Sequence, residues 1–312
     1  MGDATGDPLQ GAGRASHLVV YSVATRAKLQ STNSTQMSMD LAESLAKDGF
    51  LDLNVQNWLR FYFAGLHSHT AYSDGTFTPA IAHEYARDVA KLDVFCLTDH
   101  LESVDEIEWL DMREQAWDFN ENGKFVAIPG LEYSEAGDQA IQLMEVRRDK
   151  EEKAFIRALD KGWHIAPDGS DDTHAPNWGN AGRWTGILAP GLSKRCIWEA
   201  LKNRRVYSTL DRNCWLRFRV NGAEMGSIVD EPVGEVEVYV RVSDPDSDDA
   251  ISKIELFEDG KVVATDTPNK NARCWPVSRK PEPGRHYYLV KVTQADGNRL
   301  RSAPVWVKVS GE

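Results

Sequence analysis

The stretch that decides the fold runs from residue 59 to residue 75 and reads LRFYFAGLHSHTAYSDG. It opens with an apolar run around Phe61–Phe63, which is typical of a buried strand. His67 and His69 follow two residues apart, so the alternation of a strand would turn both imidazoles to the same side. Two histidines on one side of a strand end are suited to chelate a metal ion.

Polar residues that can bind a metal recur near the ends of the later apolar runs. In chain order they are Asp74, Asp99, His100, Glu132, Asp172 and His174. An acidic loop such as 168–172 is by itself usually a turn, but recurrence at several strand ends favours a shared site, because the carboxyl ends of parallel strands converge on one face. Nitrogen and oxygen ligands without thiolate indicate two or three divalent ions of zinc, manganese or iron.

Between residues 59 and 212, short apolar runs alternate with helical periods, which predicts an α/β domain built of βα units. A helix is predicted to begin at Thr78-Pro79, an N-cap followed by proline in the first turn. Its predicted buried stripe consists of Ile81, Tyr85, Val89 and Leu92. His83 lies off that stripe and is expected at the surface.

After residue 212 the pattern changes to short alternating segments separated by turn signals such as Asp259-Gly260 and Asp296-Gly297. This pattern predicts an all-β sandwich over residues 213–312. Residues 1–58 form an N-terminal extension with a helix expected near 37–47, and no functional motif stands in it.

The composition excludes two classes of function. The formal net charge of −12 disfavours binding to nucleic acid, and no apolar run is long enough to span a membrane. The opening residues carry no secretory signal, so the chain is either cytoplasmic or, as the sandwich favours, a processed exported chain. Cys96 is expected to be a buried free thiol, whereas Cys214 and Cys274 are either free or paired in an oxidising compartment.

The motif series resembles the PHP (polymerase and histidinol phosphatase) superfamily of metal-dependent phosphoesterases. It comprises HSHTAYSDG at 67–75, TDH at 98–100, GLE at 130–132 and DTH at 172–174. The segments KGWH at 161–164, NWGN at 177–180 and RRVY at 204–207 look similar to the carbaryl-hydrolase-like branch. The resemblance implies a distorted (β/α)7-type barrel, here shortened, followed by an immunoglobulin-like sandwich.

The resemblance also implies a distribution of ligands. One ion would be held by His67, His69, Glu132 and Asp172, and another by Asp74, His100 and His174. Asp99 would orient a ligand rather than bind metal. His164 lies near these motifs in the sequence and is a further candidate to touch metal or substrate. Arg183 would either clamp an anionic substrate or form a structural salt bridge.

Relatives carry two further histidines after the position of Glu132, but the ten residues from Tyr133 to Gln142 contain none. A third metal position therefore lacks its other ligands here. Glu135, Asp138 and Glu145 are weak candidates to replace them.

These features predict a metal-dependent hydrolase, most simply a phosphoesterase, that uses a metal-bound hydroxide and needs no serine or cysteine nucleophile. Its partner would be a small-molecule ester or phosphoester. One alternative is a carboxylic or carbamic ester hydrolase on the same site. Another is a degenerate, metal-stabilised protein that binds a carbohydrate or a protein through the β-sandwich.

Overall fold

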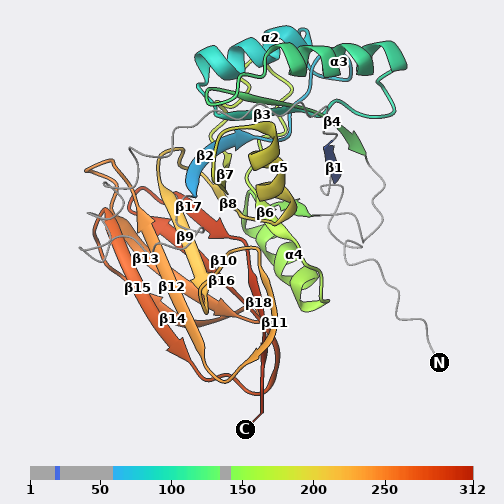
Figure 1. The fold of residues 1–312 in the computed structure, drawn as a ribbon. Helices are drawn as coiled ribbons and strands as arrows, with labels where there is room; N and C mark the ends of the chain where they lie inside the picture. The colour runs from blue at the N-terminus through green and yellow to red at the C-terminus, as the bar shows by residue number, and fades with distance from the viewer. Residues whose placement is uncertain (1–17, 22–58, 134–141, 312) are drawn as a thin grey trace, which may run out of the picture.

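The computed structural model describes residues 18–21, 59–133 and 142–311. It is a mixed α/β structure that is rich in sheet and has few helices (Figure 1). The N-terminal extension, apart from residues 18–21, lies outside the described residues, and so does the helix expected near 37–47.

The N-terminal part is organised on three strands that pair in parallel. These are β2 (Arg60–Gly65), β3 (Val94–Leu97) and β4 (Val126–Tyr133), in the spatial order β4-β3-β2. All four residues of β3 are buried, as its continuous apolar run predicts. A further strand, β1 (Leu18–Tyr21), pairs antiparallel with β4.

The expected (β/α)7 barrel is not confirmed. β2 pairs antiparallel with β7 (Trp184–Ala189), and β7 pairs antiparallel with β8 (Val206–Thr209). β5 (Leu143–Glu145) and β6 (Ala166–Asp168) form a separate two-stranded parallel sheet. Within the described residues the strand order of the main sheet is therefore linear, not circular.

Two of the helical segments in the described residues begin at a residue whose side chain caps them. The described helical segments are α2 (Pro79–Glu84), the π-helical turn η2 (Tyr85–Val89), α3 (Glu106–Asp118), α4 (Asp149–Asp160) and α5 (Lys194–Lys202). Asp105 caps α3 in a capping box with Glu108, and the Ser193 hydroxyl caps α5. α2 and α3 lie side by side over β3 and β4 (Figure 1).

The buried face of α2 and η2 differs from the predicted stripe. Ile81 and Val89 are 43% and 58% exposed, whereas Ala82 and Ala86 are fully buried. The face of α2 that is buried consists of Pro79, Ala82 and His83, which precede the π-helical turn. His83 is therefore not at the surface; it stacks on Phe119 and meets Phe95 edge-on. Leu92, the last residue of the predicted stripe, is buried as predicted.

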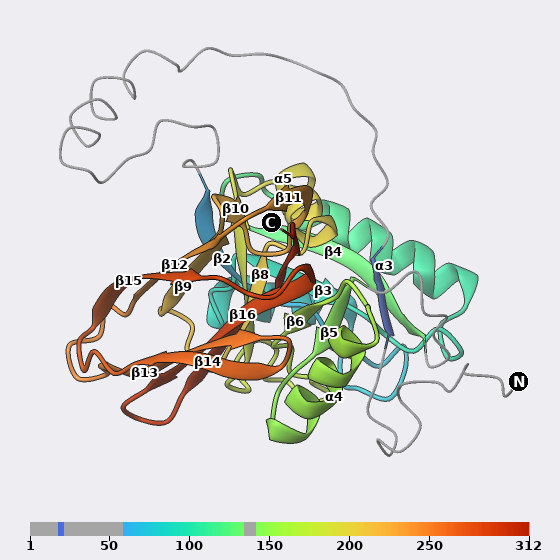
Figure 2. The ribbon, with the colours of Figure 1, turned by 90° about the horizontal axis from the view of Figure 1, so that it is seen from below.

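The C-terminal part consists of two packed layers of strands, as predicted. One layer contains β9 (Trp215–Val220), β10 (Ala223–Glu224), β12 (Val236–Ser243) and β15 (Ala272–Arg279). The other contains β11 (Ile228–Val233), β13 (Ile251–Glu258), β14 (Lys261–Asp266), β16 (Gly284–Gln294), β17 (Arg299–Ser302) and β18 (Val305–Val309). Figure 2 shows β12 and β15 facing β13, β14 and β16. Phe218, Val240 and Leu256 belong to the shared core between the layers.

The two parts are joined by pairing between strands and by ion pairs. β8 pairs antiparallel with β17, so one sheet continues through the predicted boundary at residue 212. Glu152 on α4 accepts hydrogen bonds from Lys291 (2.8 Å) and from buried Arg301 (2.6 Å). α4 is therefore fixed against the C-terminal layers by charge as well as by apolar contact.

All four cysteines are free thiols. Cys96 is buried, as predicted. Cys214 is buried and Cys274 is exposed, so the pairing considered for them is absent. None of the helices in the described residues has the length and apolar character that a membrane span requires.

Candidate metal centre

His67 and His69 lie where the chain continues beyond β2 between two neighbours. The Ser68 N–H donates to Thr98 Oγ1 (3.1 Å), and the His69 N–H donates to the carbonyl of Thr173 (2.8 Å). This extended backbone turns both rings to the same side, as the alternation predicts. Their Nε2 atoms lie 3.1 Å apart, and both side chains are fully buried.

Glu132 and Asp172 bring carboxylates to the same point. Glu132 lies near the end of β4, and its Oε2 is 3.0 Å from His67 Nε2 and 3.2 Å from His69 Nε2. Asp172 Oδ1, from the loop after β6, is 3.5 Å and 3.3 Å from the same two nitrogens. We call these four residues the inner set.

The spacing within the inner set fits a metal ion. Ligands about 2.0–2.1 Å from a tetrahedral zinc ion lie about 3.3 Å from one another. The His67 Nε2, His69 Nε2, Glu132 Oε2 and Asp172 Oδ1 separations above run from 3.0 to 3.5 Å. Two imidazoles and two carboxylates are also the donors that zinc, manganese or iron accept.

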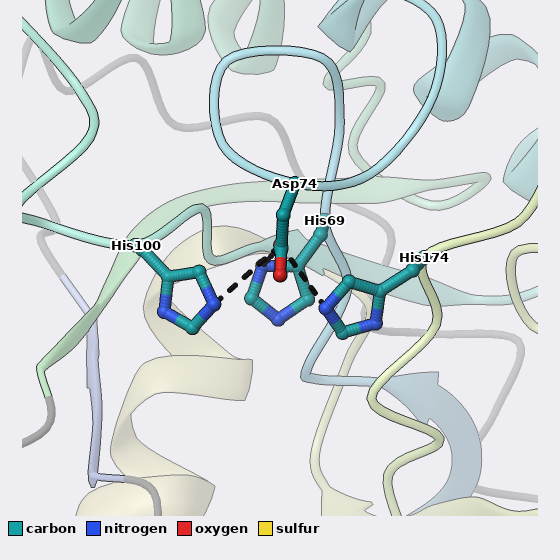
Figure 3. A group of neighbouring side chains, drawn as sticks. All are labelled: His69, Asp74, His100 and His174. Carbon is teal, nitrogen blue, oxygen red and sulfur yellow. Dashed lines mark ion pairs between the residues drawn. The ribbon is translucent and has the colours of Figure 1, made fainter.

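Asp74, His100 and His174 form a second group, the outer set, beside the first. Asp74 Oδ1 lies 3.5 Å from His100 Nε2 and 3.1 Å from His174 Nε2. Figure 3 shows the Asp74 side chain directed into the space among these two rings and that of His69. His69 Nδ1 is also 3.8 Å from Asp74, but its Nε2 faces the inner set, and a neutral imidazole has one lone pair for a metal. The outer set therefore counts three ligands.

The loop that carries Asp74 is held by Asp99. The Asp99 carboxylate accepts hydrogen bonds from the Thr70 N–H (2.7 Å), the Thr70 hydroxyl (2.8 Å) and the Ser73 hydroxyl (2.6 Å). Gly75 closes the loop, since a Cβ there would lie 2.6 Å from the backbone carbon of His69. Asp99 thus lies behind the ligands and orients the loop, which is the position expected for it.

The electrostatics of the inner set favour a cation. Burial opposes a charge on the His67 ring, but the carboxylates of Glu145 and Glu132 outweigh it and raise the pKa of His67 to about 10. Burial would likewise raise the pKa of Asp172, yet its contacts with His69, His67 and Arg147 hold that pKa well below its usual range. The same negative charge that binds a proton would stabilise a metal ion.

Two residues that contact the ligands of the inner set were not predicted in that role from the sequence. Glu145, considered only as a weak replacement ligand, lies behind His67, with its Oε1 2.5 Å from His67 Nδ1. Arg147, which was not considered, contacts Glu145 Oε2 (3.0 Å) and Asp172 Oδ2 (3.6 Å). The only available signal was their place at the end of the apolar run 143–146.

The remaining predicted residues do not join the two sets. His164 meets Trp306 edge-on and is not grouped with the candidate ligands of the described residues, and its contact with a substrate stays a prediction. Arg183 lies near Asp171, and its charge helps to offset the burial that raises the pKa of that carboxyl to about 7; both alternatives for Arg183 stay predictions. Glu135 and Asp138 lie outside the described residues.

Comparison with known proteins gives structural likeness alone. No family model and no curated protein matches the chain. A two-domain protein containing a predicted PHP-like metal-dependent phosphoesterase from Bacteroides vulgatus ATCC 8482 is 15% identical, with a TM-score of 0.40, over 81% of this chain and 96% of that one. The fibronectin(III)-like modules of Clostridium thermocellum CbhA are 16% identical, with a TM-score of 0.21, over 30% of this chain and 99% of theirs. Scores this low transfer neither fold nor function, so the functional argument rests on the site.

Proposed function

We propose that this protein is a metal-dependent hydrolase of phosphoesters that uses two divalent ions. The observation that carries the proposal is the pairing of the inner set with the adjacent outer set. Glu132 Oε2 connects them, because it lies within 3.2 Å of His69 Nε2 and of His100 Nδ1. Adjacent ions of this kind are typical of enzymes that hydrolyse phosphoesters.

The two sets differ in their access to solvent. His67, His69 and Glu132 are fully buried, whereas Asp74 is 59% and His174 is 38% exposed. An inner ion would therefore be enclosed by protein, and an outer ion would face the solvent from which a substrate arrives. Bound there, the ions would lower the pKa of a water molecule and neutralise charge on phosphoryl oxygens.

The contacts of Ser73 support a mechanism that uses no serine nucleophile. The Ser73 hydroxyl lies 3.3 Å from His69 Nδ1, which resembles the start of a serine nucleophile arrangement. However, that hydroxyl donates to Asp99 at 2.6 Å. Ser73 therefore connects Asp99 to His69, and its role is to hold the ring in place.

Metal analysis combined with hydrolysis assays tests this function. The protein should contain zinc, manganese or iron and hydrolyse p-nitrophenyl phosphate, and His67→Ala should lose both properties. His164→Ala, which changes an exposed histidine outside both ligand sets, is the matched control for metal content, which it should retain. Turnover of a naphthyl carbamate alone would assign the site to carbamic esters, and metal without turnover of either ester would favour a binding protein.

A further inference from the structure

A second polar cluster lies where the N-terminal part joins the C-terminal layers. Three carboxylates converge there on the side-chain amide of Gln294, at the end of β16. The distances from Gln294 Nε2 are 2.7 Å to Asp211 Oδ2, 2.5 Å to Asp244 Oδ2 and 2.9 Å to Asp249 Oδ2. None of these residues belongs to the inner or the outer set.

The geometry of this cluster directs one oxygen of each carboxylate to a common point. The other oxygen of each accepts a backbone N–H: Asp211 Oδ1 from Asn213 (2.9 Å), Asp244 Oδ1 from Asp246 (2.8 Å) and Asp249 Oδ1 from Asp296 (3.3 Å). The backbone thus fixes the carboxylates, and each Oδ2 points at the Gln294 amide.

The Gln294 amide cannot satisfy this arrangement alone. An amide nitrogen carries two hydrogens, so it can donate to two of the three carboxylates. Gln294 is 1% exposed, and its Oε1 is buried without a hydrogen-bond partner among the described residues. Turning the amide by 180° would place Oε1 about 2.5–2.9 Å from the three Oδ2 atoms, so that four oxygens would crowd together without a cation to bind them.

Burial makes this concentration of negative charge costly. Asp244 is 3% exposed; its burial and the charges of Asp211 and Asp249 raise its pKa. The buried Cys214 thiol lies in the same group, and its Sγ is within 4.8 Å of ligand atoms of Asp211 and Asp244. Asp211 and Asp249 are half-buried, so the three carboxylates meet with only part of their surface in water, and a cation would offset their repulsion.

We propose that Asp211, Asp244 and Asp249, with Gln294, form a structural binding site for a hard divalent cation, Ca²⁺. Carboxylate and amide oxygens are the ligands that Ca²⁺ prefers, and they outnumber the single thiol. Asp211 lies on the connection between β8 and β9, whereas Asp244 and Asp249 lie on the connection between β12 and β13. The ion would therefore fasten the chain at the point where it passes into the C-terminal layers.

Calorimetric titration with CaCl₂ tests the proposal on the full chain with its transition metals in place. We expect one Ca²⁺ per chain and a saturable rise in melting temperature, because a ligand that binds only the folded state stabilises it. Asp249→Asn should weaken binding about tenfold or more, whereas Asp248→Asn, at the neighbouring exposed acid, should leave it unchanged. His67→Ala should also retain Ca²⁺, which separates this site from the hydrolase site.

Gln294→Glu distinguishes an ion site from a hydrogen-bonded cluster. With Ca²⁺ present, a fourth carboxylate is another ligand, so binding should persist or tighten. Without an ion the same change adds a fourth negative charge to the cluster, at a buried position, and the protein should be destabilised whether or not Ca²⁺ is added. The absence of binding by the wild-type chain, Ca²⁺ affinity unchanged in Asp249→Asn, or Zn²⁺ binding that depends on Cys214 would each overturn the proposal.

Discussion

Glu145 Oε1 lies 2.5 Å from His67 Nδ1, on the ring nitrogen opposite the one that faces the inner set. A carboxylate in this position fixes the tautomer and orientation of a ligating histidine and increases its basicity. We therefore predict that Glu145→Gln weakens metal binding at the inner set about 10- to 100-fold while the fold is retained. Competition with a chelator of known affinity measures this change, and wild-type affinity in the variant would rule out the assigned role.

Gly75→Ala should affect the outer set selectively. The new methyl group would lie 2.6 Å from the backbone carbon of His69 and 2.7 Å from its oxygen, and backbone atoms in a paired segment cannot move aside easily. The loop must shift, and Asp74 with it, so we expect one of two bound metal ions to be lost. Metal content per chain is the measurement. Gly234→Ala, where a methyl group meets no atom within 4 Å, is the control and should keep both ions.

Glu152→Gln should destabilise the joint between α4 and the C-terminal layers. The variant removes the nearer of the two carboxylates that contact the buried guanidinium of Arg301 and leaves only Asp149, at 3.8 Å, which we expect to cost about 2–3 kcal/mol in the free energy of unfolding. Urea denaturation at neutral pH measures the loss, and Glu114→Gln on the exposed part of α3 is the control. A variant as stable as the wild type would show that this ion pair does not fix α4.

The stabilisation that Glu152 contributes should depend on pH. Burial raises the pKa of Glu152, but Arg301 and Lys291 outweigh it and lower that pKa below its model-compound value of 4.5. The stabilisation is therefore present above pH 4.5 and is lost as the pH falls through the lowered pKa of the folded state. The difference between wild type and Glu152→Gln should accordingly shrink in acid.

His83→Phe should make the protein less sensitive to acid. Burial, with a contribution from Lys194, lowers the pKa of His83 from 6.5 to about 3. Between these two pH values His83 is protonated in the unfolded chain and neutral in the folded chain. Stability is unaffected above pH 6.5 and falls as the pH decreases towards 3. At pH 5 the wild type should have lost about 2 kcal/mol that the variant keeps. Unfolding free energies measured at pH 7.5 and pH 5 test this, and equal losses in the two proteins would contradict it.

The strands and the ligand positions were largely predictable because both follow local patterns. The continuous apolar run at 94–97 predicts β3, and the polar residues that follow such runs include His100 and Glu132. Parallel pairing then brings these residues together, which requires only that the runs be strands.

The remaining features depend on contacts that no local pattern reports. The apolar spacing of Ile81 and Val89 predicted the wrong helix face, because the buried face carries alanines and His83, which a stripe of large apolar residues does not include. Glu145 is predictable from the sequence only as a candidate ligand, and the placement of β5 against β6 directs it to the far side of the His67 ring. The convergence of Asp211 and Asp244 on Gln294 joins segments far apart in the chain, so their spacing carries no signal.

Counting transition-metal ions per chain by elemental mass spectrometry, in the wild type and in Asp74→Ala, tests the central claim most directly. Two adjacent ligand sets predict two ions in the wild type and one in the variant, with p-nitrophenyl phosphate hydrolysis lost together with the outer ion. A wild-type chain that binds no transition metal when zinc or manganese is supplied, or an Asp74→Ala variant with unchanged metal content and turnover, would contradict the two-ion hydrolase.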